Sequence, residues 1–436
     1  MGTTTTDTTT TTTDNNTPPT TTTTATTITR HSFTKYSQTT SYLAAGPETG
    51  PLLIFIHGWP ALAETWTPQL EAFSALHFRC IAPDLPGYGK SEVSNANSSR
   101  DHSLYTLQNV VTQLVHLIKH GLQREEAIWI GGSGHDWGAA VVWALVAHHP
   151  EVCLGVVNMA IPYRTLEMGG PRELVKYADR DVYPEDEYPF AQWAYQAWYE
   201  KLTPDEFAQA VAVFDRDVEA FLKVFFAKRP HQRQQELLSS GGGGGDDDDK
   251  NNNEGEEEEE EHLDATVAAD IKNKPAFTAH VLKNGGWFGG GGPDAAPPQI
   301  PLAETLLSED MLRAMVAAFD DEGGGFWAPT AYYLNHDANL KWCEDWSVND
   351  GVVSVPVLFV ECPADVVAGT YHNSRLKGPM EAYCRKLTTV PIDAGHWVAL
   401  EKPQETNAAI LRWIAREIPE ERGWPYGKKN PLKKNV

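Results

Sequence analysis

Residues 127–147 read AIWIGGSGHDWGAAVVWALVA, and this stretch decides the fold. Its first six residues form a short apolar run typical of a buried strand, and from Trp137 onward the pattern predicts a helix. Gly134 and Gly138 flank Asp136, so the chain is expected to pass through a tight turn directly from strand to helix. This Gly-x-nucleophile-x-Gly pattern is typical of a nucleophile elbow, with aspartate in place of serine. Such a turn exposes its central side chain, and the helix N-terminus favours a negative charge there.

Two other interpretations of the elbow stay open. Ser133 is a rival nucleophile, but its pattern Gly131-x-Ser133-x-His135 puts a bulky residue where the second glycine belongs. Asp136 could also serve only as the N-cap of the following helix. The elbow pattern favours Asp136 as the nucleophile.

Strand-like and helix-like segments alternate on both sides of this stretch. This alternation predicts an α/β fold, a mostly parallel sheet with helices on both faces. The other expected strands are Leu52–His57, Phe78–Pro83, Val152–Asn158, Val355–Glu361 and Leu387–Ile392, and the other expected helices are Leu107–His120 and Ala408–Ile418.

The composition divides the chain into parts. Residues 31–162 and 340–436 are expected to form the α/β core, and 163–339, rich in Trp and Tyr at helical spacing, an inserted helical cap. The Thr-rich residues 1–30 and the acidic, Gly-rich insertion at about 239–262 cannot bury enough apolar surface to order, so both are expected to be disordered.

Partners for an aspartate nucleophile follow in the chain order nucleophile, acid, histidine. Asp365 comes just after the expected strand Val355–Glu361, and His396 follows the next strand. Both therefore belong at the carboxyl edge of the sheet, where open α/β sheets place their ligands. Asp393, three residues before His396, is a rival orienting acid, but the chain order favours Asp365.

The segment His57-Gly58-Trp59-Pro60 follows the strand at 52–57. A turn here can aim the backbone N–H of Trp59 into the site, where it would join that of Trp137 in a two-donor oxyanion hole. His57 could be a catalytic base instead. Because His396 fills that role in the expected chain order, His57 is better explained as a structural residue of the turn.

Together, these segments resemble the α/β-hydrolase-fold epoxide hydrolases of the soluble type, over about residues 32–235 and 300–420. In that family two cap tyrosines donate to the epoxide oxygen. The first lies in a segment that matches Tyr195-Gln196-Ala197-Trp198-Tyr199, which points to Tyr195. The second lies in a segment that matches Ala331-Tyr332-Tyr333-Leu334-Asn335, which points to Tyr333, although Ala331 replaces the family's asparagine. Tyr199 and Tyr332 could take these roles, and ordinary aromatic packing is the alternative for each tyrosine.

The resemblance implies hydrolysis of a small apolar epoxide by water to a vicinal diol, through an ester on Asp136 and with neither metal nor organic cofactor. A haloalkane or haloacid dehalogenase would use the same fold and the same nucleophile, but Trp59 stands where many haloalkane dehalogenases have asparagine. A third alternative is a non-catalytic binding protein. Such proteins usually lose a member of the triad, and here all three members are present.

Charge and composition exclude other classes. The net charge is −24, so the chain would repel phosphate backbones and nucleic acid is not an expected partner. No apolar run reaches the roughly 18 residues of a membrane span, and the start has no secretory pattern. Five scattered cysteines without metal-binding spacing fit free thiols in a reducing compartment, so a cytoplasmic protein is expected.

Overall fold

The computed structural model describes residues 27–93, 100–132, 136–229, 275–288, 295–320, 324–368, 370 and 373–419, and the side chains of Asp136 and Trp346 lie outside this description. Within these residues, eight strands form one sheet in the order β1-β2-β4-β3-β5-β6-β7-β8. The pairs β1–β2 and β2–β4 are antiparallel, and every other pair is parallel. The predicted α/β sheet is therefore confirmed.

The strands are β1 (Thr29–Lys35), β2 (Gln38–Ala45), β3 (Leu52–Ile56), β4 (Arg79–Pro83), β5 (Ala127–Gly131), β6 (Cys153–Met159), β7 (Val353–Glu361) and β8 (Cys384–Pro391). The core helices are α1 (Thr67–Ala75), α2 (Leu107–His116), α3 (Asp136–His148), α14 (Gly378–Tyr383), α15 (Val398–Glu401) and α16 (Pro403–Glu417).

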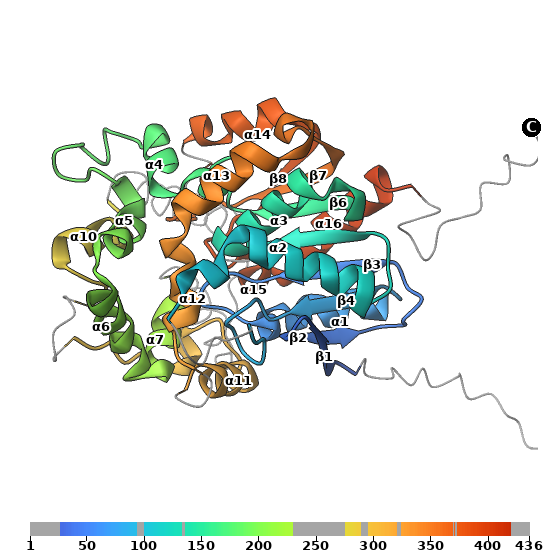
Figure 1. Cartoon of the computed structure of the whole chain (residues 1–436), viewed down its shortest axis with the longest axis horizontal. Helices are drawn as coiled ribbons and strands as arrows, with labels where there is room; N and C mark the ends of the chain where they lie inside the picture. Colours follow the sequence, from blue (N-terminus) through green and yellow to red (C-terminus); the bar gives the residue numbers. More distant parts are fainter. Residues whose placement is uncertain are drawn as a thin grey trace, which may run out of the picture.

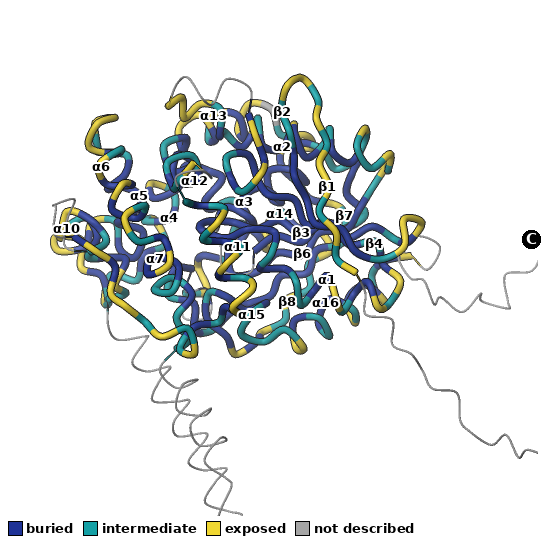
Figure 2. The backbone as a smooth tube through the Cα atoms, turned by 90° about the horizontal axis from the view of Figure 1, so that it is seen from below, coloured by how far each residue is buried: buried dark blue, intermediate teal, exposed yellow. Residues whose placement is uncertain are grey.

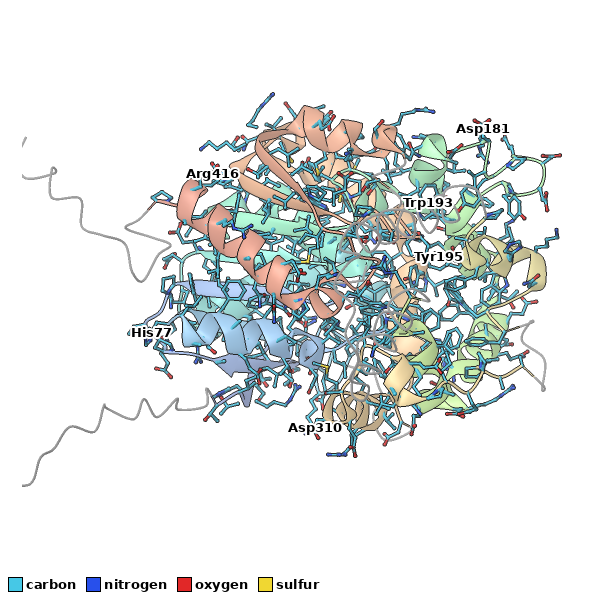
Figure 3. All side chains as sticks on the ribbon, turned by 180° about the vertical axis from the view of Figure 1, so that it is seen from behind. His77, Asp181, Trp193, Tyr195, Asp310 and Arg416 are labelled. Atoms are coloured by element: carbon cyan, nitrogen blue, oxygen red, sulfur yellow. The ribbon has the colours of Figure 1, made fainter. Side chains whose placement is uncertain are left out.

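Helices cover both faces of the sheet because alternate strand residues point to opposite sides. On β3, Ile54 belongs to the cluster packed under α2 and α3, which Figure 1 shows in front of the sheet. Its neighbours Leu53 and Phe55 pack instead with α1 and α16, which Figure 3 shows from the opposite side. Figure 2 shows the central strands as buried along their length. Burial on both faces explains their continuous apolar sequences.

The boundaries of every strand named agree with the structure to within about three residues, whereas the expected helix Ala408–Ile418 begins five residues earlier, at Pro403. The first hairpin was not predicted. β1 and β2 pair antiparallel at the sheet edge, with Thr29 opposite Ala44. The expected tail, residues 1–30, therefore ends too late. Arg30 lies within β1 and forms ion pairs with Glu64 and the buried Asp84. Residues 1–26 lie outside the described parts of the chain.

The expected helical cap lies between β6 and β7, and Figure 1 shows its helices gathered at one end of the molecule, beyond the sheet. The expected boundary at 339 falls inside helix α13 (His336–Trp346). The acidic insertion at 239–262 lies outside the described residues. The helices of this region are α4 (Pro171–Leu174), α5 (Ala194–Lys201), α6 (Pro204–Asp215), α7 (Val218–Phe225), α10 (Val281–Asn284), α11 (Glu309–Phe319), α12 (Trp327–Ala331) and α13 (His336–Trp346).

Local sequence explains where several cap helices begin. Thr203 and Glu206 form a reciprocal capping box at the start of α6. The Asp217 carboxylate accepts the N–H of Ala220 at the start of α7, and the Ser308 hydroxyl caps α11. These caps satisfy N–H groups that have no partner within the helix.

Candidate active site

The carboxyl ends of four parallel strands meet at one edge of the sheet. Ile56 of β3 pairs with Gly131 of β5, Gly131 with Asn158 of β6, and Asn158 with Phe359 of β7. The loops that follow these strands therefore converge. They carry most of the residues that the sequence analysis singled out.

Between β5 and the first turn of α3, neither Gly132 nor Gly138 has room for a side chain. Gly132 has φ +98°, a left-handed conformation that favours glycine, and a Cβ there would lie 2.9 Å from Met159. A Cβ on Gly138 would lie 2.6 Å from the carbonyl oxygen of Ile56. The helix thus begins directly against the end of β3. Asp136 is the first residue of the 13-residue helix α3, where the helix dipole favours a carboxylate.

The rival nucleophile Ser133 lies outside the described residues, as does the side chain of Asp136. The main chain places Asp136 at the start of α3, five residues after the end of β5. The side chain of Trp137, the next residue, is fully buried.

Asp365 and His396 form a bonded pair. The His396 Nδ1 and the Asp365 Oδ1 are 3.0 Å apart, and the same oxygen accepts the N–H groups of Val367 at 2.7 Å and Ala368 at 3.3 Å. The Asp365 side chain is 1% exposed and that of His396 is 19% exposed. A carboxylate fixed by two main-chain donors can hold one ring nitrogen of the imidazole and leave the other directed elsewhere.

Asp393, the rival acid, lies elsewhere. Its side chain is 61% exposed and lies 3.7 Å from the guanidinium of Arg229. The structure therefore pairs His396 with Asp365.

The turn after β3 uses His57 as a structural residue. The Nε2 of His57 accepts the N–H of Leu85 at 2.9 Å, and Nδ1 lies 2.9 Å from the carbonyl oxygen of Gly58. Burial lowers the pKa of His57 to about 4, so the ring is neutral at neutral pH. With both nitrogens engaged, His57 is unsuited to act as a base.

The cap places Tyr195 and Tyr333 together. Their ring centroids are 5.5 Å apart, and both side chains are buried. The Tyr333 ring also contacts Trp137 at 5.4 Å and Trp59 at 5.8 Å, the two residues expected to supply oxyanion-hole N–H groups. The Tyr195 hydroxyl accepts a hydrogen bond from Gln196 Nε2 at 2.9 Å. Figure 3 shows Tyr195 on the cap side of the molecule.

The neighbouring tyrosines have structural partners. The Tyr332 hydroxyl donates to the carbonyl oxygen of Pro86 at 2.9 Å, and burial raises the pKa of this phenol. The Tyr199 hydroxyl accepts from the indole N–H of Trp287 at 2.7 Å. Because Tyr332 uses its only proton in that bond, it is a poor candidate for an acid.

Two aromatic neighbours of the site were not predicted. Trp287 contacts the ring of Tyr195 at 5.2 Å, and His336 stacks on Trp137 at 5.6 Å with its Nδ1 2.8 Å from Glu200. Trp287 stands in a Gly- and Pro-rich stretch, and His336 matches no motif. Both come to the site through folding of the cap, so no local signal marked them.

The described residues were searched for metal-binding groups of side chains and for helices that could span a membrane. Among them, no group of three or more His, Cys, Asp or Glu side chains could hold a metal ion. None of the helices seen in this part of the chain is both long and apolar enough to span a bilayer.

The mostly parallel eight-stranded sheet, with α3 starting at Asp136 just after β5 and with Asp365 and His396 paired on later loops, is the arrangement of the α/β hydrolase fold. A comparison with protein families agrees, since residues 51–246 match the alpha/beta hydrolase fold family.

Proteins similar in sequence carry a more specific name than the fold family does. The chain is 25% identical over 370 residues to bifunctional epoxide hydrolase 2 of Sus scrofa, covering 84% of this chain and 52% of the relative. It is 24% identical over 381 residues to epoxide hydrolase B of Mycobacterium tuberculosis, covering 84% and 92% of the two chains. The chain thus spans about half the length of the first of these relatives and nearly all of the second.

Solved structures show the same fold. Epoxide hydrolase A from Mycobacterium thermoresistibile superposes with a TM-score of 0.60 at 24% identity, covering 89% of this chain and 99% of that one. A laboratory-evolved variant of potato epoxide hydrolase gives 0.61 at 21% identity, with 89% and 99% covered. The chain therefore has the α/β hydrolase fold and is similar in sequence to proteins named epoxide hydrolases.

Proposed function

We propose that this protein hydrolyses epoxides to vicinal diols through a covalent ester on Asp136. The observation that carries the proposal is the pair of adjacent cap phenols, Tyr195 and Tyr333, of which Tyr333 packs against Trp59 and Trp137. Two phenols beside the elbow suit a departing oxygen, which needs a proton, better than a departing halide. The relatives named as epoxide hydrolases support the same reaction.

In the first step, a carboxylate oxygen of Asp136 attacks an epoxide carbon and the ring C–O bond breaks. The departing oxygen takes a proton from Tyr195 or Tyr333, and a hydroxyalkyl ester results. A carboxylate is ionised at neutral pH, so this step needs no base. The helix dipole at the start of α3 favours the charged form of Asp136 before the attack.

In the second step, His396 removes a proton from water, and the resulting hydroxide attacks the ester carbonyl. Asp365 holds the imidazole and stabilises its positive form. The N–H of Trp137, in the first turn of α3, and that of Trp59 receive the charge on the carbonyl oxygen. Collapse breaks the ester C–O bond and releases the diol, whose alkoxide takes the proton from His396. The proton of the attacking hydroxide, left on the Asp136 carboxyl, returns to the tyrosinate formed in the first step, so that both the carboxylate and the phenol are restored. The sequence of steps requires no cofactor.

The substrate class we propose is a small apolar epoxide, because aromatic side chains surround the two phenols. Trp287, Phe221 and Phe225 all contact the ring of Trp59 or Tyr195. The five cysteines are free and buried, which suits a reducing compartment such as the cytoplasm.

The test separates the two steps. His396→Gln should still open styrene oxide and then stall, so the intact protein mass should rise by the full mass of the epoxide. Asp136→Ala, the matched control, should show no adduct. A haloalkane would instead add its mass minus hydrogen halide. Normal turnover by His396→Gln, or an adduct that peptide mass spectrometry maps to Ser133 or a cysteine, would disprove this mechanism.

A further inference from the structure

The loop that carries His396 is held by a buried carboxylate outside the triad. Glu401, the last residue of α15, accepts the N–H of Gly395 on Oε2 at 3.0 Å and the N–H of Trp397 on Oε1 at 3.1 Å. These two residues flank His396 in the sequence. The Glu401 side chain is only 2% exposed. One carboxylate therefore clamps the main chain on both sides of the base.

Arg229 neutralises this clamp. Its Nε donates to Glu401 Oε2 at 2.9 Å, and its guanidinium lies 3.5 Å from the carbonyl oxygen of Asp393 in the same loop. The Arg229 side chain is 15% exposed, and the residue lies four positions after the end of α7. A buried charge needs such a partner, because an isolated carboxylate in this environment is strongly disfavoured.

The space around the pair is closely filled. A Cβ built on Gly395 would lie 3.0 Å from Glu401 Oε1 and 3.2 Å from Arg229 Cδ. A residue with a side chain at position 395 would therefore crowd the ion pair, and glycine lets the loop pass close to it. The adjacent carbonyl of Ala394 accepts the N–H of Ala364, one residue before the acid Asp365. The ion pair, the base loop and the acid loop are thus in direct contact.

A second link joins the same loop to the end of α7. The indole N–H of Trp397 donates to the carbonyl oxygen of Phe225 at 2.7 Å, and its ring stacks on Phe226 with centroids 3.7 Å apart. Two independent contacts therefore connect the residues beside His396 with the segment that ends α7. Movement of this part of the cap would therefore displace the loop that carries His396.

We infer that Arg229 and Glu401 are positioning residues that fix the orientation of His396 and couple it to the end of α7. The inference rests on the proposed function, because it assigns the pair to one step of that reaction. Only the attack of water needs the base. The pair therefore acts on ester hydrolysis and leaves ester formation on Asp136 unaffected.

The experiment measures the two steps separately in single turnovers of styrene oxide, with rapid quench and intact-protein mass. Glu401→Gln and Arg229→Met should each slow ester hydrolysis about 10–100-fold, because a displacement near 1 Å can cost about 10² in rate. Ester formation should stay within about threefold of the wild-type rate. Arg229→Lys keeps the charge and should recover most of the hydrolysis rate.

The matched control is Glu417→Gln, which removes the exposed ion pair between Arg416 and Glu417. Figure 3 shows Arg416 at the core end of the molecule, on the side away from Tyr195. Both steps should be unchanged in this variant. Unchanged ester hydrolysis in both Glu401→Gln and Arg229→Met overturns the inference. An equal loss of both steps in folded protein also overturns it, since that indicates a general structural effect.

A second measurement does not need turnover. Selective ¹⁵N-histidine labelling, with His396 assigned from the spectrum of His396→Gln, reports the ring tautomer through long-range ¹H–¹⁵N couplings. We expect one tautomer with the proton on Nδ1 in the wild type and in Arg229→Lys, and a mixture in Arg229→Met and Glu401→Gln. An unchanged His396 signal in both Arg229→Met and Glu401→Gln contradicts the positioning role of the pair. If the wild type opens no epoxide, the proposed function fails, and this spectrum still decides the role of the pair.

Discussion

Replacing the two cap phenols with phenylalanine tests the proposed acids most directly. Tyr195→Phe and Tyr333→Phe should each slow ester formation about tenfold, since the remaining phenol can still donate. The double variant should lose about 10²–10⁴-fold, the usual contribution of general-acid catalysis. At about 1.4 kcal/mol for each tenfold change, that loss corresponds to roughly 3–5 kcal/mol of the barrier.

The structure indicates that these variants should fold. Phenylalanine keeps the ring contacts of Tyr333 with Trp59, Trp137 and Tyr195. At Tyr195 the substitution removes the acceptor of the Gln196 amide, and a buried donor without a partner costs about 1–3 kcal/mol. The lost acceptor alone should lower the free energy of unfolding of Tyr195→Phe by about that amount.

The assay is ester formation in a His396→Gln background, where the reaction stops before hydrolysis. Tyr332→Phe is the matched control, because it makes the same chemical change one residue away from Tyr333. It removes the bond to the carbonyl of Pro86 and should cost about 1–3 kcal/mol of stability, with ester formation unchanged.

The refuting result is a folded double variant, by circular dichroism, that forms the ester at the wild-type rate. The phenols would then not be the acids, and the dehalogenase alternative would return. Release of halide from a haloalkane would then be the next measurement. Loss of ester formation in Tyr332→Phe alone would also contradict the assignment, because it would move the acid to Tyr332.

Two further predictions concern stability. Burial raises the pKa of the Glu167 carboxyl from 4.5 to about 7, so its ionisation destabilises the folded state as the pH rises from about 4.5 through 7, by about 3 kcal/mol in all. Glu167→Gln should therefore gain in melting temperature relative to the wild type between pH 5 and pH 8, and a gap independent of pH would contradict this. Deleting residues 1–26 and 239–262 should leave the melting temperature unchanged, because of their composition. Deleting residues 1–30 also removes Arg30 and leaves the buried Asp84 without its cation, so it should cost about 1–3 kcal/mol, visible as a loss of several degrees.

Sequence predicted the central strands well because they are buried on both faces. The continuous apolar runs of β3, β5 and β7 are direct consequences of that burial. The hairpin of β1 and β2 gave no such signal. β1 lies at the sheet edge and is partly exposed along its length, so it needs no continuous apolar run. Its sequence, TRHSFTK, is polar and resembles the Thr-rich segment before it. Its pairing with β2 defines it as a strand, and a composition pattern does not contain that pairing.

The cap tyrosines show a finer limit. The resemblance led to the segment Ala331-Tyr332-Tyr333-Leu334-Asn335, but adjacent tyrosines there fit it almost equally well. The structure separates them because Tyr332–Leu334 form a 3₁₀ turn, in which successive side chains point about 120° apart. Tyr332 then reaches Pro86, and Tyr333 reaches Trp137 and Tyr195. The direction of each hydroxyl depends on this turn, and the residue order alone does not determine it.

The identity of the base and the way it is held are encoded differently. His396 could be predicted because the triad residues follow a fixed chain order and each lies just after a strand. Both features are visible in the sequence as short local patterns. Glu401 and Arg229 are separated by 172 positions, and the acidic insertion lies between them. Their contact exists only after the segment that follows α7 has folded against α15 and the His396 loop. A change near the insertion, far from His396 in the sequence, can therefore act on the step that His396 performs, and the triad residues alone would not predict it.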